Sequence, residues 1–341
     1  MSSTGYSSNY ITVLTVLSSF AVMMLHFNGV FWNHPAGSLW ISSNIIETAF
    51  YFAVPVFFMI TGCTLIDYRE RYSTRVFFYK RFMRTVLPFI IWSLIAYLFW
   101  CARGGKLCLS PLFVIKGIFN CHFMSMYWFF MPLFGIYLSI PVLSMLPEKV
   151  KVFTYMSLLA FCTLCLPGFL TQAVGGHFFP KSLEFPLCSG YLIYPLLGYV
   201  LHKVELRPIV RLLIYVAGAA SAVAHFFATL MLSDSAGICM LFKNYQHCTT
   251  VFFAVAVFVA AKYNADAILS CTPVRKCIEY VKPTTLGVYL THIYALWFCR
   301  YLGVNTSSIL FRTVGTCLLF VVLVWCISQV QRVSIGRFLL P

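Results

Sequence analysis

The sequence contains few charged residues. Of its 341 residues, 10% are charged and 61% are hydrophobic, whereas a soluble domain carries about 25% charged residues. This composition excludes an ordinary soluble protein and predicts an integral membrane protein. Acidic residues are the scarcer charged class, with 9 Asp and Glu against 24 Lys and Arg.

The sequence also lacks a soluble domain, an internal repeat and a low-complexity tract. The longest polar stretches between apolar runs are 103–123, 171–185, 232–246 and 264–283. None of them is long enough to fold alone. We therefore expect a single transmembrane domain over 1–341, with any functional groups among the helices or in these short loops.

No metal or redox framework is visible among the fourteen cysteines. Cys162 and Cys165 have the C-x-x-C spacing inside an apolar run, where packing is the expected role. Two further pairs, Cys108 with Cys121 and Cys239 with Cys248, fall on the predicted outer side and could pair in an oxidising compartment. The histidines have no metal-ligand spacing, so no metal site is predicted.

Ten long apolar runs make up most of the chain. A membrane-spanning helix needs roughly 20 mostly apolar residues, and uninterrupted runs favour helices over a β-barrel. We predict an all-α, polytopic bundle of about ten transmembrane helices. The spans are expected near 10–32, 41–66, 76–100, 124–146, 152–170, 186–202, 208–231, 247–263, 284–303 and 308–330.

The basic residues indicate the orientation of these spans. Short cytoplasmic loops carry an excess of Lys and Arg, and most of the basic residues share one side if the N-terminus is cytoplasmic. Ten spans then place the N- and C-termini in the cytoplasm. The first run is too long for a signal-peptide core and has no Lys or Arg before it, so it is expected to be a retained helix. Dispersed basic residues give no case for nucleic-acid binding.

Ionisable side chains inside predicted spans are candidates for a functional site, because such groups are costly in a bilayer. His26 lies six residues before Trp32, and Glu47 lies seven residues after Trp40. Both are therefore about 9 to 10 Å below the same interface and could face each other. A carboxylate that orients an imidazole is a recurrent general-base arrangement. Helix-packing hydrogen bonds or a wet vestibule are the alternative explanation.

Arg81 and Arg84 form a second concentration of polar groups, in "YKRFMRTVLPF". A separation of three residues places them on one helix face, at the predicted cytoplasmic mouth of the third span. Arginine suits phosphate oxygens because it donates paired hydrogen bonds and stays charged. Basic residues beside anionic lipid headgroups produce the same pattern.

Three other residues are candidates for lining a site. His292 falls near mid-membrane in the span 284–303, although a lone histidine there is more often a core residue. Tyr127 and Trp128 fit an interfacial aromatic belt or a platform on which a sugar stacks.

These features, in this order, resemble membrane acyltransferase family 3, whose ten-helix members O-acylate bacterial polysaccharides and other cell-surface glycans. The first matching feature is the histidine that ends "VLSSFAVMMLH". The others are "FAVPVFFMITG" at 52–62, "FYKRFMRTVLPFIIWS" at 78–93, "YWFF…YLSIPVL" at 127–143, "YLIYPLLGYVLHK" at 191–203 and "TLGVYLTHIYAL" at 285–296. Together they cover nearly the whole chain.

The resemblance implies acyl transfer across a bacterial cell membrane. The co-substrate would be acetyl-CoA, or another acyl-CoA, on the cytoplasmic side, with no bound cofactor. The acceptor would be a hydroxyl of a glycan or lipid-linked glycan on the outer side. Residue by residue, it implies catalysis by His26 and binding of the coenzyme A phosphates by Arg81 and Arg84, and His292 matches a frequent histidine of the penultimate span.

The sequence departs from the family pattern at two places. The family usually has an arginine eleven residues before the first-helix histidine, and this position is Thr15 here. The common His-Leu-Trp of the fourth span reads Met126-Tyr127-Trp128, with His122 nearby.

We therefore predict a membrane O-acetyltransferase in which Glu47 supports His26. The histidine would act as general base or carry the acyl group as an acyl-imidazole. O-succinyl transfer is also open, and it would favour an extra cation such as Arg300. The alternatives are an exporter of a glycan or small acid, with His26, Glu47 and His292 along its pathway, and an inactive scaffold of a glycan-assembly complex.

Overall fold

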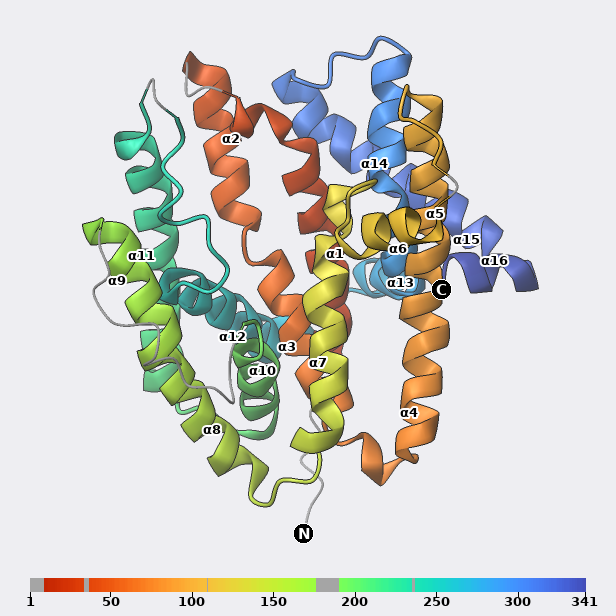
Figure 1. Cartoon of the computed structure of the whole chain (residues 1–341). Helices are drawn as coiled ribbons and strands as arrows, with labels where there is room; N and C mark the ends of the chain where they lie inside the picture. Colours follow the sequence, from red (N-terminus) through yellow and green to blue (C-terminus); the bar gives the residue numbers. More distant parts are fainter. Residues whose placement is uncertain (1–8, 34–36, 109, 176–189, 235–236) are drawn as a thin grey trace.

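The structure is a computed structural model that describes residues 9–33, 37–108, 110–175, 190–234 and 237–341. Over these ranges the chain folds into helices and forms no strand (Figure 1). The predicted all-α fold class is therefore confirmed.

The helices share the apolar composition of the predicted spans and are joined by short connections. They are α1 (Asn9–Phe27), α2 (Gly37–Phe50), α3 (Ala53–Leu65), α4 (Thr74–Arg81), α5 (Leu87–Ala102), α6 (Pro111–Phe119), α7 (Phe130–Leu143), α8 (Lys149–Ala160), α9 (Leu166–Val174), α10 (Ile193–Lys203), α11 (Pro208–Leu232), α12 (Cys248–Ser270), α13 (Thr272–Val281), α14 (Thr285–Tyr301), α15 (Thr316–Val330) and α16 (Ser334–Leu339).

Short segments of other helix types extend these helices. Five-residue π-helical turns join α4 to α5, join α8 to α9 and precede α15, at Phe82–Val86, Phe161–Cys165 and Phe311–Gly315. The 3-10 segments Gly29–Trp32 and Ser125–Phe129 follow α1 and precede α7.

Eight helical rods within the described ranges are long and apolar enough to cross a membrane. They are Asn9–Phe27, Gly37–Glu70, Thr74–Ala102, Ser125–Leu143, Lys149–Val174, Pro208–Leu232, Cys248–Ser270 and Phe311–Val330. The other two predicted spans contain shorter helices: α14 has 17 residues and α10 has 11. Residues 186–189 of the predicted span 186–202 lie outside the described residues. The eight apolar helices support a membrane protein. The predicted number of ten crossings and the cytoplasmic location of both termini remain predictions.

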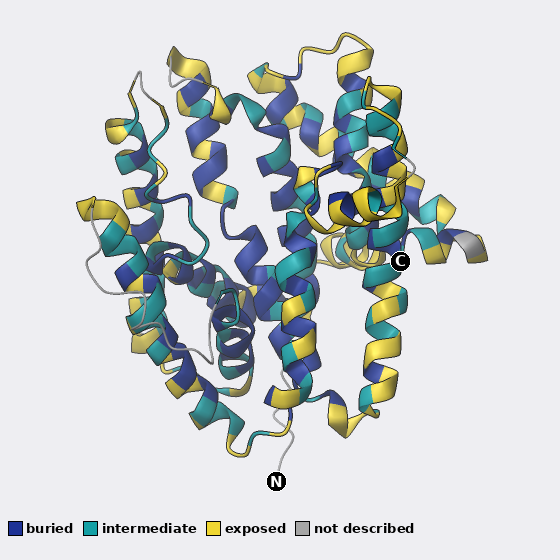
Figure 2. Ribbon diagram, in the orientation of Figure 1, coloured by how far each residue is buried: buried dark blue, intermediate teal, exposed yellow. Residues whose placement is uncertain are grey.

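Helix α1 lies at the centre of the bundle. It packs against α2, α3, α12 and α14, and 67% of its most apolar 18-residue window is buried inside the protein. The corresponding share is only 11% for α11. Figure 2 shows the same contrast, with buried residues on the central helices and exposed ones on the outer helices. An apolar outer surface of this kind suits lipid contact, and the central helix is where polar groups can be shielded from lipid.

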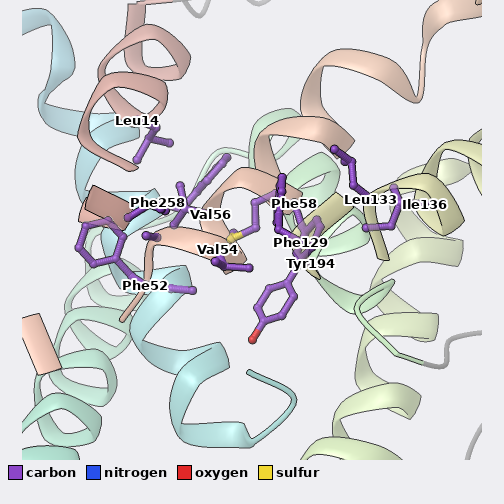
Figure 3. Packing of buried hydrophobic residues seen from close by; sticks show 14 of the residues in the cluster. Leu14, Phe52, Val54, Val56, Phe58, Phe129, Leu133, Ile136, Tyr194 and Phe258 are labelled. Carbon is purple, nitrogen blue, oxygen red and sulfur yellow. The ribbon is translucent and has the colours of Figure 1, made fainter. Parts of the chain in front are cut away.

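Helices α3 and α10 cross with their backbones in direct contact. A Cβ at Gly62 would overlap the backbone of Pro195, and one at Gly198 would overlap the backbone of Met59. Small residues allow this close approach between membrane helices. Figure 3 shows the adjoining core, in which Phe58 of α3 lies beside Phe129 and Tyr194. The crossing fixes α3, which contributes to the walls of two cavities.

Two polar ties hold the ends of the bundle. At the face where α1 begins, called the N-terminal face here, Asp67 forms ion pairs of 2.8 Å with Lys149 and of 2.8 Å with Lys203. Near the opposite face, the fully buried Arg312 donates hydrogen bonds to Asn28 Oδ1 at 3.1 Å and to Ser42 Oγ at 2.9 Å. These hydrogen bonds hold α2 against the segment that precedes α15. We therefore assign the buried Arg312 a structural role.

The described cysteines are free thiols, including Cys108, Cys121, Cys239 and Cys248. The pairs proposed from the sequence are therefore not formed in this structure.

Candidate functional site

A cavity of about 340 Å³ lies beside the end of α1 that is nearer the opposite face. Trp32 is one of its lining residues and is 53% exposed, so the cavity reaches the protein surface. Its other lining residues come from α1, α2, α3 and α14, from the 3-10 segment after α1, from the turn between α2 and α3, and from the segments before α7 and α12. They are Val22, Leu25, His26, Gly29, Glu47, Tyr51, Val54, Met126, Trp128, Lys243, Tyr245 and Tyr289.

His26 and His292 form a hydrogen-bonded pair at this cavity. Nδ1 of His26 lies 2.5 Å from Nε2 of His292, and the two rings are nearly parallel, at an interplanar angle of 12°, with centroids 4.8 Å apart. The contact joins α1 to α14. His26 is partly exposed and lines the cavity, whereas His292 is 1% exposed and lies behind it. The structure therefore brings together two residues that the sequence proposed separately.

The backbone fixes which ring nitrogens carry protons. Nδ1 of His292 lies 3.1 Å from the carbonyl oxygen of Val288, and a carbonyl can only accept. In the neutral ring Nδ1 is then the donor, and Nε2 must accept. It accepts the proton on Nδ1 of His26, so the Nε2 atom of His26 keeps a free lone pair. This is the protonation state that a general base requires.

Glu47 lines the same cavity but is paired with a different residue. Its Oε1 atom lies 3.8 Å from Nζ of Lys243, and both side chains are buried. The expected support of His26 by Glu47 is replaced in the structure by support from His292. The physical reason is that a buried carboxylate is strongly stabilised by a cation, and the loop before α12 brings Lys243 to it.

Lys243 is a cavity residue that the sequence analysis missed. It belongs to a short loop, where a lysine usually marks topology, and only the folded loop shows that its side chain is fully buried. Burial lowers the pKa of Lys243 to about 8, and the neighbouring Glu47 opposes that shift. The ammonium group lies over the rings of Phe31, at 4.3 Å, and Tyr51, at 5.1 Å.

Three aromatic rings are stacked along one wall of the cavity. The Trp128 and Tyr245 rings are 5.7 Å apart at an interplanar angle of 20°, and those of Tyr245 and Tyr51 are 4.5 Å apart at 12°. Trp128 therefore lies where the sequence placed a possible sugar platform. Tyr127 points elsewhere: it is 1% exposed and donates a hydrogen bond of 2.7 Å to the carbonyl of Leu290.

A second, smaller cavity of about 160 Å³ is lined by residues of α1, α3, α7 and α14, among others. Tyr289 is among the lining residues of both cavities. Thr15, the position of the family's usual arginine, also lines the smaller one. The hydroxyl of Thr15 donates a hydrogen bond of 2.7 Å to the carbonyl oxygen of Ile11. Threonine carries no charge, so this position does not supply the positive charge of the family's usual arginine.

Arg81 and Arg84, the two arginines proposed to bind phosphate, differ in their surroundings. The Arg81 guanidinium lies 5.8 Å from the centroid of the Tyr137 ring, and Tyr137 lines the smaller cavity. The Nε atom of Arg81 is buried without a hydrogen-bond partner among the described residues, whereas Arg84 is exposed. The shared face expected from an α-helix is altered because Arg84 belongs to a π-helical turn, which rotates less per residue.

Arg300 borders a separate cleft of about 600 Å³, together with Arg103 and Trp297. His122 is exposed and packs against Trp100. Neither residue is among those that line the cavity at His26.

These features define an integral membrane protein whose central helices surround a surface-connected cavity lined by His26, Glu47 and Lys243. The model of the acyltransferase domain matches residues 8–328, so the chain belongs to acyltransferase family 3. Neither the curated proteins nor the solved structures include a significant match to this chain.

Proposed function

We propose that this membrane acyltransferase moves an acetyl group from acetyl-CoA to a hydroxyl of a cell-surface polysaccharide or of its lipid-linked precursor. The observation that supports this most strongly is the His26–His292 pair, which leaves one basic nitrogen of His26 at a surface-connected cavity. The cavity also offers aromatic rings and polar groups suited to a sugar.

His26 acts as the general base in this mechanism. Its Nε2 atom takes the proton of the acceptor hydroxyl while the oxygen attacks the thioester carbonyl. The tetrahedral intermediate then collapses, the C–S bond breaks, and the departing thiolate takes the proton from His26. His292 holds the His26 ring in the required tautomer and accepts the hydrogen bond that stabilises the transient imidazolium.

An acyl-imidazole on His26 is the alternative route. Nε2 would attack the thioester and release the thiolate. The acyl group would then pass to the hydroxyl oxygen, the bond to Nε2 would break, and the hydroxyl proton would neutralise the thiolate. The same nitrogen is used in both routes, so loss of His26 abolishes either one.

In this proposal the donor enters from the N-terminal face, and the excess of basic residues there supports a cytoplasmic location for that face in a bacterial cell. Arg81 binds coenzyme A phosphate there, with an unused buried nitrogen directed into the protein, and Arg84 adds charge at the surface. The acyl arm extends through the smaller cavity towards Tyr289 and His26. An extended ligand is required because the two ends are separated by much of a bilayer core of about 30 Å.

The direct test uses membranes that contain the wild-type protein or His26→Ala, radiolabelled acetyl-CoA and glycolipids of a bacterial host. We expect labelled glycan with the wild type and none with the variant. His122→Ala is the matched control, because His122 is exposed and does not line the cavity. Transfer by His26→Ala at the wild-type rate would refute the assigned role, and correctly inserted wild type that never transfers label would favour export.

A further inference from the structure

Two charged groups at the cavity have hydrogen-bonding capacity that the described part of the protein leaves unused. Nζ of Lys243 and Oε2 of Glu47 are buried and have no hydrogen-bond partner there. The 3.8 Å approach between Nζ and Oε1 is an ion pair but is too long for a hydrogen bond. Because buried polar groups are normally hydrogen-bonded, these two atoms indicate a ligand that both accepts from Lys243 and donates to Glu47.

The charge balance of the pair selects the chemistry of that ligand. One cation and one anion lie side by side, so the pair carries no net charge to attract an ion. A ligand carboxylate near Lys243 would be repelled by Glu47, and a ligand ammonium near Glu47 would be repelled by Lys243. A hydroxyl group both accepts and donates, and neighbouring hydroxyls match the pair without adding charge.

The remaining walls fit the ring that carries such hydroxyls. Tyr51, Tyr245 and Trp128 are stacked along the cavity, and an aromatic surface packs against the C–H face of a sugar. A volume of about 340 Å³ lies in the range of roughly 300–1,000 Å³ typical of small-ligand sites. His26 lines the same space, so it can receive the proton of a hydroxyl on the same ring.

We infer that Lys243 and Glu47 together bind hydroxyls of an uncharged sugar in the acceptor, and that they discriminate against sugars bearing a carboxylate. This inference rests on the proposed acyl transfer, to which it adds the class of acceptor. Lys243 is then a specificity residue, and Glu47 contributes to acceptor binding instead of orienting His26. The pair is held in place by α2 on one side and the loop before α12 on the other.

The test measures binding of methyl β-D-glucopyranoside and methyl β-D-glucopyranosiduronic acid to the purified full chain by saturation-transfer NMR. We expect the wild type to bind the glucoside on the order of tenfold more tightly than the glucuronide. Lys243→Met should weaken glucoside binding by a similar factor. Lys106→Met is the matched control, because Lys106 is an exposed loop lysine away from the cavity, and it should bind as the wild type does.

Glu47→Gln provides a test of the charge argument. This near-isosteric change leaves Lys243 uncompensated, so the preference should shift from the glucoside towards the glucuronide. The wild-type preference needs no variant and remains informative if one variant fails to fold. Tighter glucuronide binding by the wild type, or no binding of either glycoside, would overturn the inference, as would an unchanged affinity of folded Lys243→Met for the glucoside.

The same two glycosides, supplied with labelled acetyl-CoA, separate this inference from the proposed function. Selective glucoside binding that requires Lys243, with no acetyl transfer to any acceptor, would leave the sugar site standing and refute the acyltransferase mechanism. Efficient transfer to the glucuronide by the wild type would support acyl transfer and overturn the assignment of an uncharged acceptor.

Discussion

The two cavities that share Tyr289 as a lining residue differ in how their polar groups are arranged. In the larger one, His26, Glu47 and Lys243 are each held by a specific partner. In the smaller one, the polar lining residues carry only hydroxyls, including Thr15 and Thr85, and the nearest arginines lie beyond its edge. In the proposed mechanism, the larger cavity holds the reacting groups and the smaller one accommodates the acyl arm of the donor.

This difference shows where the fold fixes the positions of reacting groups. General-base catalysis depends on a single tautomer and orientation, which the Val288 carbonyl and His292 impose on His26. Binding of a phosphate by arginine depends less on exact placement, because the charge is permanent and the side chain is long. An exposed Arg84 beside a half-buried Arg81 is compatible with that task.

The largest effect that tests this contrast is expected from His292→Phe. Phenylalanine keeps an aromatic ring but cannot accept the proton on Nδ1 of His26, so the base loses its fixed orientation. We expect kcat to fall by roughly 100-fold, with little change in the KM for acetyl-CoA. His202→Phe, at a half-buried histidine that lines neither cavity, is the control. An unchanged kcat in folded His292→Phe would show that the pair has no positioning role.

A smaller effect is expected at the arginines. Charge-assisted hydrogen bonds contribute about 1.5–3 kcal/mol when buried, so Arg81→Met should raise the KM for acetyl-CoA by about tenfold or more. Arg84→Met should raise it less, by roughly threefold, because exposed charges interact weakly. Steady-state kinetics with S-acetyl-pantetheine, which lacks the phosphates, should show neither effect. Equal losses with both donors would mean that the arginines act on the fold.

The smallest effect is expected from Thr15→Arg, which is the one change here that should improve donor binding. A guanidinium at position 15 would add a permanent charge to the lining of the smaller cavity, through which the donor is proposed to extend. We expect the KM for acetyl-CoA to fall by about threefold, the size of a weak charge interaction, with kcat unchanged. Thr15→Met, which adds length without charge, is the matched control. A higher KM in Thr15→Arg would show that the donor chain needs the space beside Thr15.

The sequence predicted the elements of this fold better than their lengths. Apolar runs identify helices because the bilayer leaves few alternatives, and the helical class was correct. The 11-residue α10 was predicted as part of a full span, because hydropathy records composition and not where backbone geometry ends a helix. The crossing of α3 and α10 also depends on Gly62 and Gly198 meeting the backbone of another helix, which no local pattern predicts.

For the site, the sequence identified the groups but not all of their pairings. His26, Glu47 and Trp128 line one cavity. The signal for His26 and Glu47 was their depth in the spans, and the signal for Trp128 was a dense run of aromatic residues. The partner of His26 lies 266 residues away, so local spacing favoured the nearer Glu47. Lys243 was missed because a loop lysine looks like any other topological charge until the loop folds back into the bundle.

The most direct test of the account is the sidedness of the reaction. Sealed vesicles of known orientation, with the wild type or His26→Ala, would receive labelled acetyl-CoA on one side and a membrane-impermeant glycan on the other. We predict that the wild type acylates the glycan only when the donor is at the N-terminal face and the glycan at the opposite face. Efficient acylation with both substrates on the same side of intact vesicles would contradict the account.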